Sequence, residues 1–296
     1  MNYPLGKLLG KWKRLREQYG FRRAPIRAFK RLLSWRVRCS FQTTVIVRLP
    51  IWRLQMHLPA KWQGIGRYVF AFRENYEPEL AYLQNLLSPG GSFVDVGANL
   101  GIYTLVASRL VGNSGRVIAF EPSMQSFPLL QKNAALNELT NICAVPAALS
   151  EKAGKVRLYQ APCCPSGNSM APLPSFPECF EYVVTETLDD MLRRIPARHV
   201  DVIKMDVQGA EELVLRGARK VVASMNPVVI FEFWPAGASL LGLSPYGAWN
   251  FLAGLGYRFF TVCSASAASR IESPPTESAY ANILAIHPNS NKFPSQ

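Results

Sequence analysis

Patterns that mark metal and redox centres are scarce in this sequence. The 296 residues include six cysteines and three histidines, and no two cysteines have the C-x-x-C spacing. No histidines have the H-E-x-x-H spacing, which argues against a histidine-rich zinc site. The adjacent Cys163 and Cys164 leave two interpretations open: a metal or redox site or, as we favour, two small residues in a reducing compartment.

Long apolar segments are also missing. No window reaches the ~18 uncharged apolar residues that a transmembrane helix needs. The charged N-terminus lacks the apolar region of a signal peptide. We therefore expect a protein that is not exported and that works in the cytoplasm.

Acidic residues are nearly absent from the first part of the chain. Residues 1–62 hold fifteen Lys or Arg and one acid, Glu17, which gives a charge of +14, whereas the remaining chain sums to −1. Apolar residues at helical spacing among these cations predict a basic amphipathic helix. These apolar residues are Leu5, Leu8, Leu9, Trp12 and Leu15.

The basic segment is open to three interpretations. It is a solvated helical face packed on the rest of the protein, a peripheral contact of residues 1–40 with the anionic inner face of a membrane, or a nucleic-acid surface. Nucleic acid is the weakest of the three, because no RNA- or DNA-reading motif accompanies the charge. A second basic and aromatic stretch at residues 29–36 allows the same interpretations.

Strand and helix patterns alternate from residue 91 onward, which predicts an α/β fold with a doubly wound, mostly parallel sheet. The expected strands cover residues 93–96, 116–120, 142–145, 200–205, 227–233, 257–262 and 281–286, with a further short strand at 156–159 in a hairpin. We divide the chain into a partly helical basic extension over residues 1–88, one α/β domain over 89–288 and a polar tail over 289–296.

The turn after the first of these strands carries the strongest ligand signal. Gly97 and Gly101 permit unusual φ angles and leave room for a ligand against the backbone. The G-x-x-x-G spacing lacks the third glycine that a dinucleotide site usually has. Asp95 would repel a phosphate beside this turn, but its charge suits the cationic methionine part of S-adenosylmethionine (SAM).

A second acid ends the following strand. Glu121 comes twenty residues after Gly101, where a carboxylate can accept hydrogen bonds from both hydroxyls of a ribose. The turn and its two acids together favour a SAM site over the NAD site of an oxidoreductase. A plain Rossmann-like turn, with Glu121 capping a helix, is the simpler alternative.

Several short segments share their order and spacing with a known family. They are 93–104 (FVDVGANLGIYT), 117–122 (VIAFEP), Asn133, Asn137, 187–190 (TLDD), 202–211 (VIKMDVQGAE) and 229–232 (VIFE). On these segments the chain resembles the FkbM family of SAM-dependent methyltransferases, over roughly residues 75–285. The basic N-terminal segment lies outside the resemblance.

The resemblance implies a class I methyltransferase fold, which is a seven-stranded Rossmann-like sheet with a reversed last strand. It also implies methylation of a hydroxyl oxygen on a sugar, a glycan or a secondary metabolite. The cofactor residues that it implies are Asp95, Gly97, Asn99 and Gly101 at the methionine end of SAM, Glu121 at the ribose and Ala148 near the adenine.

A hydroxyl acceptor is a poor nucleophile at neutral pH and needs help to lose its proton. Asp206 ends its strand at the predicted crevice and is the expected general base. Lys204 shares its strand face, Glu211 follows in the first helical turn, and Glu232 ends the next strand. Simpler roles stay open for three of these catalytic candidates: Lys204 as an ion-pair partner, Glu211 as a charge at a helix N-terminus, and Glu232 in a buried network.

Oxygen ligands also converge in this region. A Mg²⁺ ion held by Asp206 and Glu232 is therefore a second role open to these acids, and the sequence does not decide between base and metal ligand. The segment 166–169 (SGNS) lies in a loop rich in Pro, Cys and Ser. We expect this segment to be either a lid over the acceptor or a flexible turn.

Three functions compete on these observations. The leading prediction is a SAM-dependent O-methyltransferase that acts on a small-molecule or glycan acceptor. An amine or a nucleic acid as the methylated acceptor is the alternative within methyltransferases, and an amine would make a base less important. A non-catalytic SAM-binding protein is the alternative of another class, and the acids at three strand ends argue against it.

Overall fold

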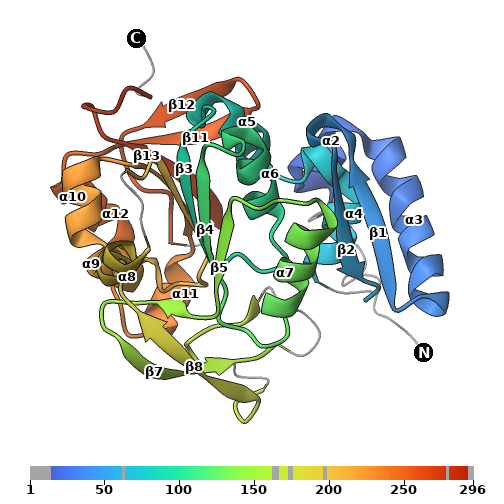
Figure 1. The fold of residues 1–296 in the computed structure, drawn as a ribbon, viewed down its shortest axis with the longest axis horizontal. Helices are drawn as coiled ribbons and strands as arrows, with labels where there is room; N and C mark the ends of the chain where they lie inside the picture. The colour runs from blue at the N-terminus through green and yellow to red at the C-terminus, as the bar shows by residue number, and fades with distance from the viewer. Residues whose placement is uncertain are drawn as a thin grey trace.

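The computed structural model describes residues 15–61, 64–161, 167–172, 176–195, 199–277 and 280–292. Its centre is an eight-stranded sheet in the order β12-β11-β13-β10-β9-β3-β4-β5 (Figure 1). The strands are β3 Ser92–Val96, β4 Arg116–Phe120, β5 Ile142–Val145, β9 Val202–Met205, β10 Val228–Phe233, β11 Arg258–Ser264, β12 Ala267–Ile271 and β13 Ala281–Ile286.

The directions of these strands confirm the predicted fold class. Strands β5, β4, β3, β9 and β10 are parallel, while β13 runs antiparallel to both β10 and β11. The last strand is therefore the reversed one that the resemblance implied. The sheet has eight strands and not seven, because β12 adds an antiparallel edge strand beside β11. Its sequence, AASRI, carries no alternation of large apolar residues that could have announced it.

The strand order reverses at β3, which places a ligand crevice there. The chain runs from β3 outward to β4 and β5, and later returns to β9 on the other side of β3. In register, Asp95 on β3 lies beside Lys204 on β9. Ligands of doubly wound sheets bind at the carboxyl ends of strands at such a switch point.

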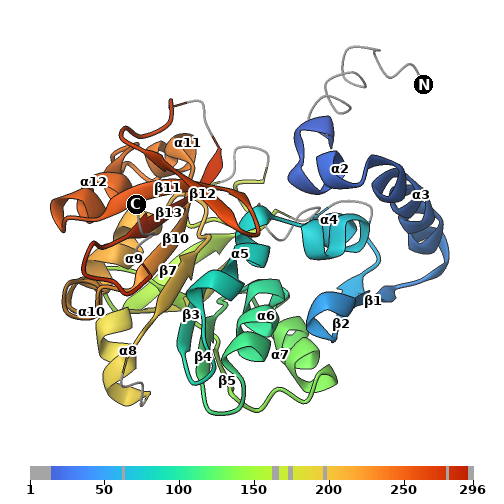
Figure 2. The same ribbon diagram turned by 90° about the horizontal axis from the view of Figure 1, so that it is seen from above.

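Helices cover both faces of the sheet, as Figures 1 and 2 show. Neighbouring residues of one strand belong to different apolar clusters: Phe93 packs toward α6, and Val94 packs toward α9 and α10. The helix expected beyond residue 210 is split at Ala218 into two short helices. The helices of this domain are α6 Ile102–Val111, α7 Phe127–Leu136, α8 Leu188–Arg194, α9 Glu211–Gly217, α10 Arg219–Met225, α11 Pro235–Leu240 and α12 Gly247–Gly254.

The residues before the sheet form a layer at one side of it, beside α6 and α7 (Figure 1). This layer contains a hairpin, β1 Thr44–Leu49 and β2 Leu54–Pro59, that we did not expect from the sequence. Alternate residues of both strands are buried, which is the signal that could have revealed it. The other elements are α2 Tyr19–Arg23, α3 Pro25–Phe41, η1 Pro50–Trp52, α4 Ile65–Phe72, η2 Arg73–Asn75 and α5 Pro78–Leu86.

Two asparagines of α7 hold this layer to the sheet domain. The side-chain oxygen of Asn133 accepts the N–H of His57 at 2.6 Å, and that of Asn137 accepts the N–H of Gln55 at 2.7 Å. Their amide groups donate in return to the carbonyls of the same two residues, and Asn133 also donates to Leu100 at 2.9 Å. The asparagines thus complete the open edge of β2 as a further strand would. The proposed division at residue 88 stays a prediction.

A small second sheet lies below the main one in Figure 1. Its order is β6-β8-β7, with β6 Ala148–Leu149, β7 Gly154–Tyr159 and β8 Phe180–Glu186. The hairpin expected around residues 156–159 is therefore present, formed by β7 and β8. None of the described helices is long and apolar enough to cross a membrane. Of the amphipathic helix expected around residues 5–15, only Leu15 belongs to the described residues.

Candidate functional site

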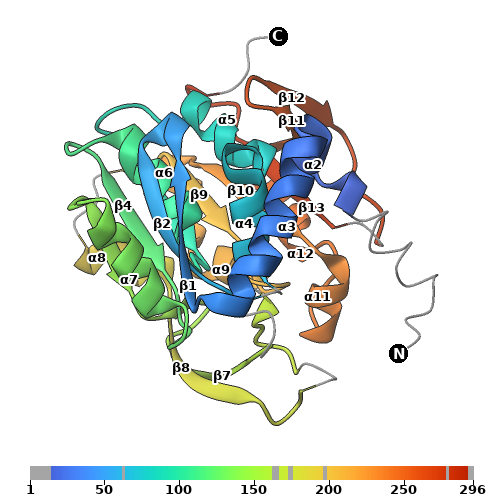
Figure 3. The same ribbon diagram turned by 90° about the vertical axis from the view of Figure 1, so that its right-hand side faces the viewer.

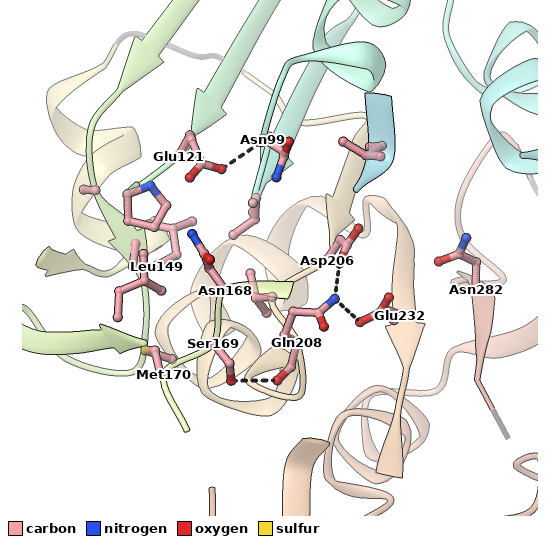
Figure 4. A pocket seen from close by; sticks show the side chains of 18 of the residues that line it. Asn99, Glu121, Leu149, Asn168, Ser169, Met170, Asp206, Gln208, Glu232 and Asn282 are labelled. Carbon is pink, nitrogen blue, oxygen red and sulfur yellow. Dashed lines mark hydrogen bonds between the residues drawn. The ribbon is translucent and has the colours of Figure 1, made fainter. Parts of the chain in front are cut away.

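A pocket opens where the loops after β3, β4, β9 and β10 meet (Figure 4). Its wall begins at Leu149 and Pro122, passes Glu121 and Asn99, and reaches Asp206. Beyond this point the lining residues are Glu232, Tyr280, Asn282, Glu77, Tyr76 and Ile65. The pocket therefore joins an apolar end to an end rich in carboxylates.

The turn after β3 adopts the left-handed conformations that its sequence suggested. The φ angles are 77° at Gly97, 51° at Asn99 and 88° at Gly101. A Cβ atom on Gly97 would lie 2.1 Å from the carbonyl oxygen of Asp206, and one on Gly101 would lie 2.4 Å from Leu130. The missing side chains thus make room for protein atoms, and a ligand against the backbone of these glycines stays a prediction. Gly97 lines the pocket with its backbone, whereas Gly101 is not among the lining residues.

Glu121 is fixed in the pocket wall by two backbone donors. One carboxylate oxygen accepts the N–H of Asn99 at 2.7 Å, and the other accepts the N–H of Ser123 at 2.9 Å. Burial raises the pKa of Glu121 to about 7, against the lowering effect of these two hydrogen bonds. The carboxylate is held in one orientation, and each oxygen keeps a lone pair for another donor.

Apolar side chains form the end of the pocket beyond Glu121. Pro122, Ala148, Leu149 and Leu158 line it, and Met170 faces them from the segment after β7. Ala148 lines this end of the pocket, and its expected contact with the adenine stays a prediction. A flat apolar ring fits such a lining.

Asp206 and Glu232 face each other across Gln208 (Figure 4). The Gln208 amide donates to Asp206 at 3.0 Å and to Glu232 at 2.9 Å. The Tyr280 hydroxyl donates to the other oxygen of Glu232. Burial raises the pKa of Glu232 well above its ordinary value, and the nearby carboxylate of Asp206 raises it further. Glu232 is thus a buried, hydrogen-bonded group, whereas the Asp206 side chain is 40% exposed to the pocket.

Lys204 lies under this part of the pocket. Its Nζ atom is 3.2 Å from the Asp206 carboxylate and 4.9 Å from the centre of the Tyr103 ring. Desolvation alone would lower the pKa of Lys204, but Asp206, Asp95 and Glu77 raise it above its ordinary value. The lysine is therefore charged and buried, and it is not among the residues that line the pocket.

Asp95 is completely buried and likewise does not line the pocket. One of its oxygens accepts the hydroxyl hydrogen of Thr104 at 2.5 Å, while the other has no hydrogen-bond partner. Burial raises the pKa of Asp95, and the charge of Lys204 opposes this shift. A direct contact between Asp95 and a cofactor stays a prediction.

Comparison with known proteins identifies the family of this chain. A profile of the family described as "Methyltransferase FkbM domain" matches residues 95–259, which is more than half of the chain. The chain belongs to the FkbM methyltransferase family. It is therefore a SAM-dependent methyltransferase with the class I fold, as the sequence predicted.

Curated relatives of this FkbM methyltransferase are also named as methyltransferases. Methyltransferase sdnD of Sordaria araneosa is 27% identical over 57% of this chain and 76% of its own length. Methyltransferase 1 of Beauveria bassiana is 30% identical over 44% of this chain and 59% of its own length. Hexuronic acid methyltransferase AglP of Haloferax volcanii is 26% identical over 46% of this chain and 53% of its own length.

A solved structure, methyltransferase FkbM from Methylobacillus flagellatus, aligns with 75% of this chain and 53% of its own length. Its identity to this chain is 16%, and the TM-score is 0.41.

Glu211 lies away from the pocket of this FkbM methyltransferase. Its carboxylate accepts the N–H of Val207 at 3.0 Å, which closes the loop between β9 and α9. Burial raises the pKa of Glu211 to about 7. This position favours the simpler of its two expected roles, a charge that stabilises the loop and the N-terminus of α9.

Several lining residues escaped sequence reasoning. Glu77 precedes α5 and accepts a hydrogen bond from the Tyr103 hydroxyl at 2.5 Å. Tyr280 lies just before β13, and Asn282 lies on β13. No motif marks these positions, because only the packing of distant segments brings them to the pocket. Gln208 lies inside a family segment, yet nothing in its spacing showed that it would bridge two carboxylates.

In the part of the chain that the structure describes, no group of three or more His, Cys, Asp or Glu could hold a metal ion. The Asp206 oxygens accept instead from Lys204 and Gln208. Mg²⁺ at Asp206 and Glu232 therefore stays an untested expectation that this geometry does not favour.

The expected lid segment is described from residue 167 onward, so Ser166 and the pair Cys163 and Cys164 lie outside the described residues. Asn168 and Ser169 line the pocket, and Figure 4 shows them on the side opposite Glu121. The Asn168 side chain accepts the N–H of Ala161 at 3.0 Å, and the Ser169 hydroxyl donates to the Gln208 carbonyl at 3.4 Å. A contact of this segment with the acceptor stays a prediction.

Proposed function

We propose that this protein transfers the methyl group of SAM to a hydroxyl oxygen of a sugar, a glycan or another small molecule, with Asp206 as general base. The observation that carries the proposal is the position of Asp206 at the junction of the cofactor end and the acid-rich end of the pocket. It is partly exposed there and is held by Lys204 and Gln208. A base needs both properties: access to the acceptor and a fixed orientation.

The lining of the pocket fits SAM in chemical type. Glu121 offers a fixed carboxylate to the ribose hydroxyls, and Leu149 with Pro122 offers an apolar surface to the adenine ring. Gly97 and Asn99 line the passage from there to Asp206. Bound SAM supplies an activated methyl group, so the protein has chiefly to align the acceptor and to remove its proton.

Asp206 receives that proton as the new carbon–oxygen bond forms. Lys204, charged and buried beneath it, holds one carboxylate oxygen, and Gln208 holds the other. Glu232 lines the pocket near Asp206 as a second carboxyl group, and its raised pKa makes it the more weakly acidic group. A positioned general base contributes on the order of 10²- to 10⁴-fold to such a reaction.

The charge of the pocket favours an acceptor without negative charge. Four carboxylates line it, those of Glu77, Glu121, Asp206 and Glu232, and no Lys or Arg stands among the described lining residues. A polyanion such as a nucleic acid would be repelled there. The match to a hexuronic acid methyltransferase supports a sugar as the class of acceptor, whereas the charge of this lining favours a sugar without the carboxylate of a hexuronic acid. An amine remains the second candidate, because carboxylates also attract a cation.

Substitution of Asp206 tests the proposal. Asp206→Asn should bind SAM as tightly as the wild type by titration calorimetry, while methyl transfer from labelled SAM to a fractionated cell extract falls at least about 100-fold. Asp190→Asn is the matched control, because the Asp190 side chain is also 40% exposed and ion-paired but lies on α8. Full turnover of Asp206→Asn with normal SAM binding would refute a base at this position and favour an amine acceptor.

A further inference from the structure

Helix α3 has two apolar faces, although a surface helix normally has one. Its inner face carries Ala28 and Trp35, both buried. The Trp35 ring lies 5.1 Å from that of Phe70 on α4, and its N–H donates to the carbonyl of Lys61 at 3.0 Å. This face accounts for the attachment of α3 to the protein, and the rest of the helix lies on the outside of the molecule (Figure 3).

The opposite face of α3 is also apolar, but it is exposed. Ile26, Leu33, Val37 and Phe41 have 71%, 53%, 60% and 84% of their surface accessible. At ~100° per residue these four positions fall within about 80° of the helix circumference. We call these four residues the outer stripe. Large apolar side chains gathered on one exposed face mark an interaction surface.

Positive charge lies within and beside the outer stripe. Arg27, Lys30 and Arg38 are exposed residues of the same helix. At ~100° per residue, Lys30 falls within the arc of the stripe, and Arg27 and Arg38 flank it on one side. The sequence contains no Asp or Glu between Glu17 and Glu74, so no acid of this stretch offsets them. A surface that combines an apolar stripe with cations on its flanks is complementary to a bilayer with anionic headgroups.

We propose that α3 docks this enzyme on an anionic membrane surface, with the outer stripe inserted at the level of the headgroups and the flanking cations bound to lipid phosphates. The helix is about 25 Å long and would lie in the plane of the interface. This docking surface is separate from the methyl-transfer pocket, so it goes beyond the proposed function and does not depend on it.

Vesicle binding tests the proposal with the full-length protein. Sedimentation should show binding to vesicles of 70% phosphatidylcholine and 30% phosphatidylglycerol, little binding to pure phosphatidylcholine, and weaker binding in 0.5 M salt. The double variant Leu33→Gln/Val37→Gln should reduce the partition coefficient at least about tenfold, because two inserted apolar side chains are lost. Both sites are exposed, so folding and SAM binding should not change.

A matched variant separates the outer stripe from surface hydrophobicity in general. Leu240 on α11 is 50% exposed and Val184 on β8 is 44% exposed, so Leu240→Gln/Val184→Gln removes the same side chains elsewhere. This control should bind vesicles like the wild type. Equal binding by the outer-stripe variant and the wild type would overturn the proposal. Failure to bind anionic vesicles, together with a dimer in sedimentation velocity that the outer-stripe variant abolishes, would assign the stripe to a contact between copies of the chain.

Discussion

In the proposed cofactor site, the raised pKa of Glu121 should make the affinity for SAM dependent on pH. Burial raises this pKa to about 7, and the two backbone N–H groups that the carboxylate accepts lower it only in part. In the proposed cofactor site the ribose hydroxyls donate to Glu121, so the ionised form of the carboxylate binds SAM. Protonation below pH 7 would remove acceptor capacity and therefore weaken binding.

The size of the effect follows from the ionised fraction of Glu121. With a pKa of about 7, roughly nine tenths of the carboxyl groups are ionised at pH 8 and about one hundredth at pH 5. The dissociation constant of SAM should therefore rise about 100-fold between these two pH values. Titration calorimetry from pH 5 to pH 8.5 measures this directly.

Substitution isolates the contribution of Glu121 from those of the other carboxylates. Glu121→Gln should bind SAM about 10- to 100-fold more weakly at pH 8, since a charged hydrogen-bond partner is lost, and its profile should be flatter than that of the wild type. Glu181→Gln is the control, because Glu181 accepts the N–H of Met124 in the same loop but does not line the pocket. Parallel profiles for the wild type and Glu121→Gln would refute a role for Glu121 in the pH dependence.

Three further substitutions test the construction of the site. Gly97→Ala should lower the free energy of unfolding by at least about 2 kcal/mol in urea denaturation, because its Cβ would lie 2.1 Å from the Asp206 carbonyl at a φ of 77°; an unchanged midpoint would contradict this reasoning. Asn133→Ala should cost about 2–4 kcal/mol in the same assay, since it removes the side-chain partner of the His57 N–H on β2 and of the buried Leu100 carbonyl. Burial raises the pKa of Glu79 to about 8 from an ordinary value of 4.5, so the stability that this carboxyl contributes is fully present below pH 4.5 and is lost as the pH rises through 8. Glu79→Gln should therefore raise the melting temperature relative to wild type at pH 9 and much less at pH 5, and equal shifts at both pH values would exclude this carboxyl as the source.

The central sheet could be predicted from the sequence because its strands are short buried runs bounded by turn residues. Helix α6 begins at Ile102 and ends at Val111, and the glycine on either side of it is a boundary that the sequence shows. The β1–β2 hairpin was missed because the basic composition of this segment drew attention to helices, although the alternation of its apolar residues is uninterrupted. Its place in the fold depends on Asn133 and Asn137, whose contact with β2 no local pattern could show.

The candidate site was also predictable from the sequence only in part. Glu121, Asp206 and Glu232 could be found because each ends a strand of a parallel sheet, and such ends meet at one edge. The positions of Lys204 and Asp95 below the pocket surface could not be found, because burial depends on how the side chains pack and not on spacing along the strand.

Some residues at the acid-rich end of the pocket lie outside the family match, and we expect acceptor specificity to arise from them. The matched residues 95–259 supply Glu121, Asp206 and Glu232, whereas Glu77 comes before them and Tyr280 after them. Glu77 lines the pocket and is hydrogen-bonded to Tyr103. Glu77→Gln keeps an acceptor for that hydroxyl but removes a charge beside the proposed acceptor. It should therefore leave the dissociation constant of SAM within about twofold while changing kcat/KM for the methyl acceptor at least about tenfold. Comparable losses in SAM affinity and in kcat/KM would instead assign Glu77 to the cofactor end.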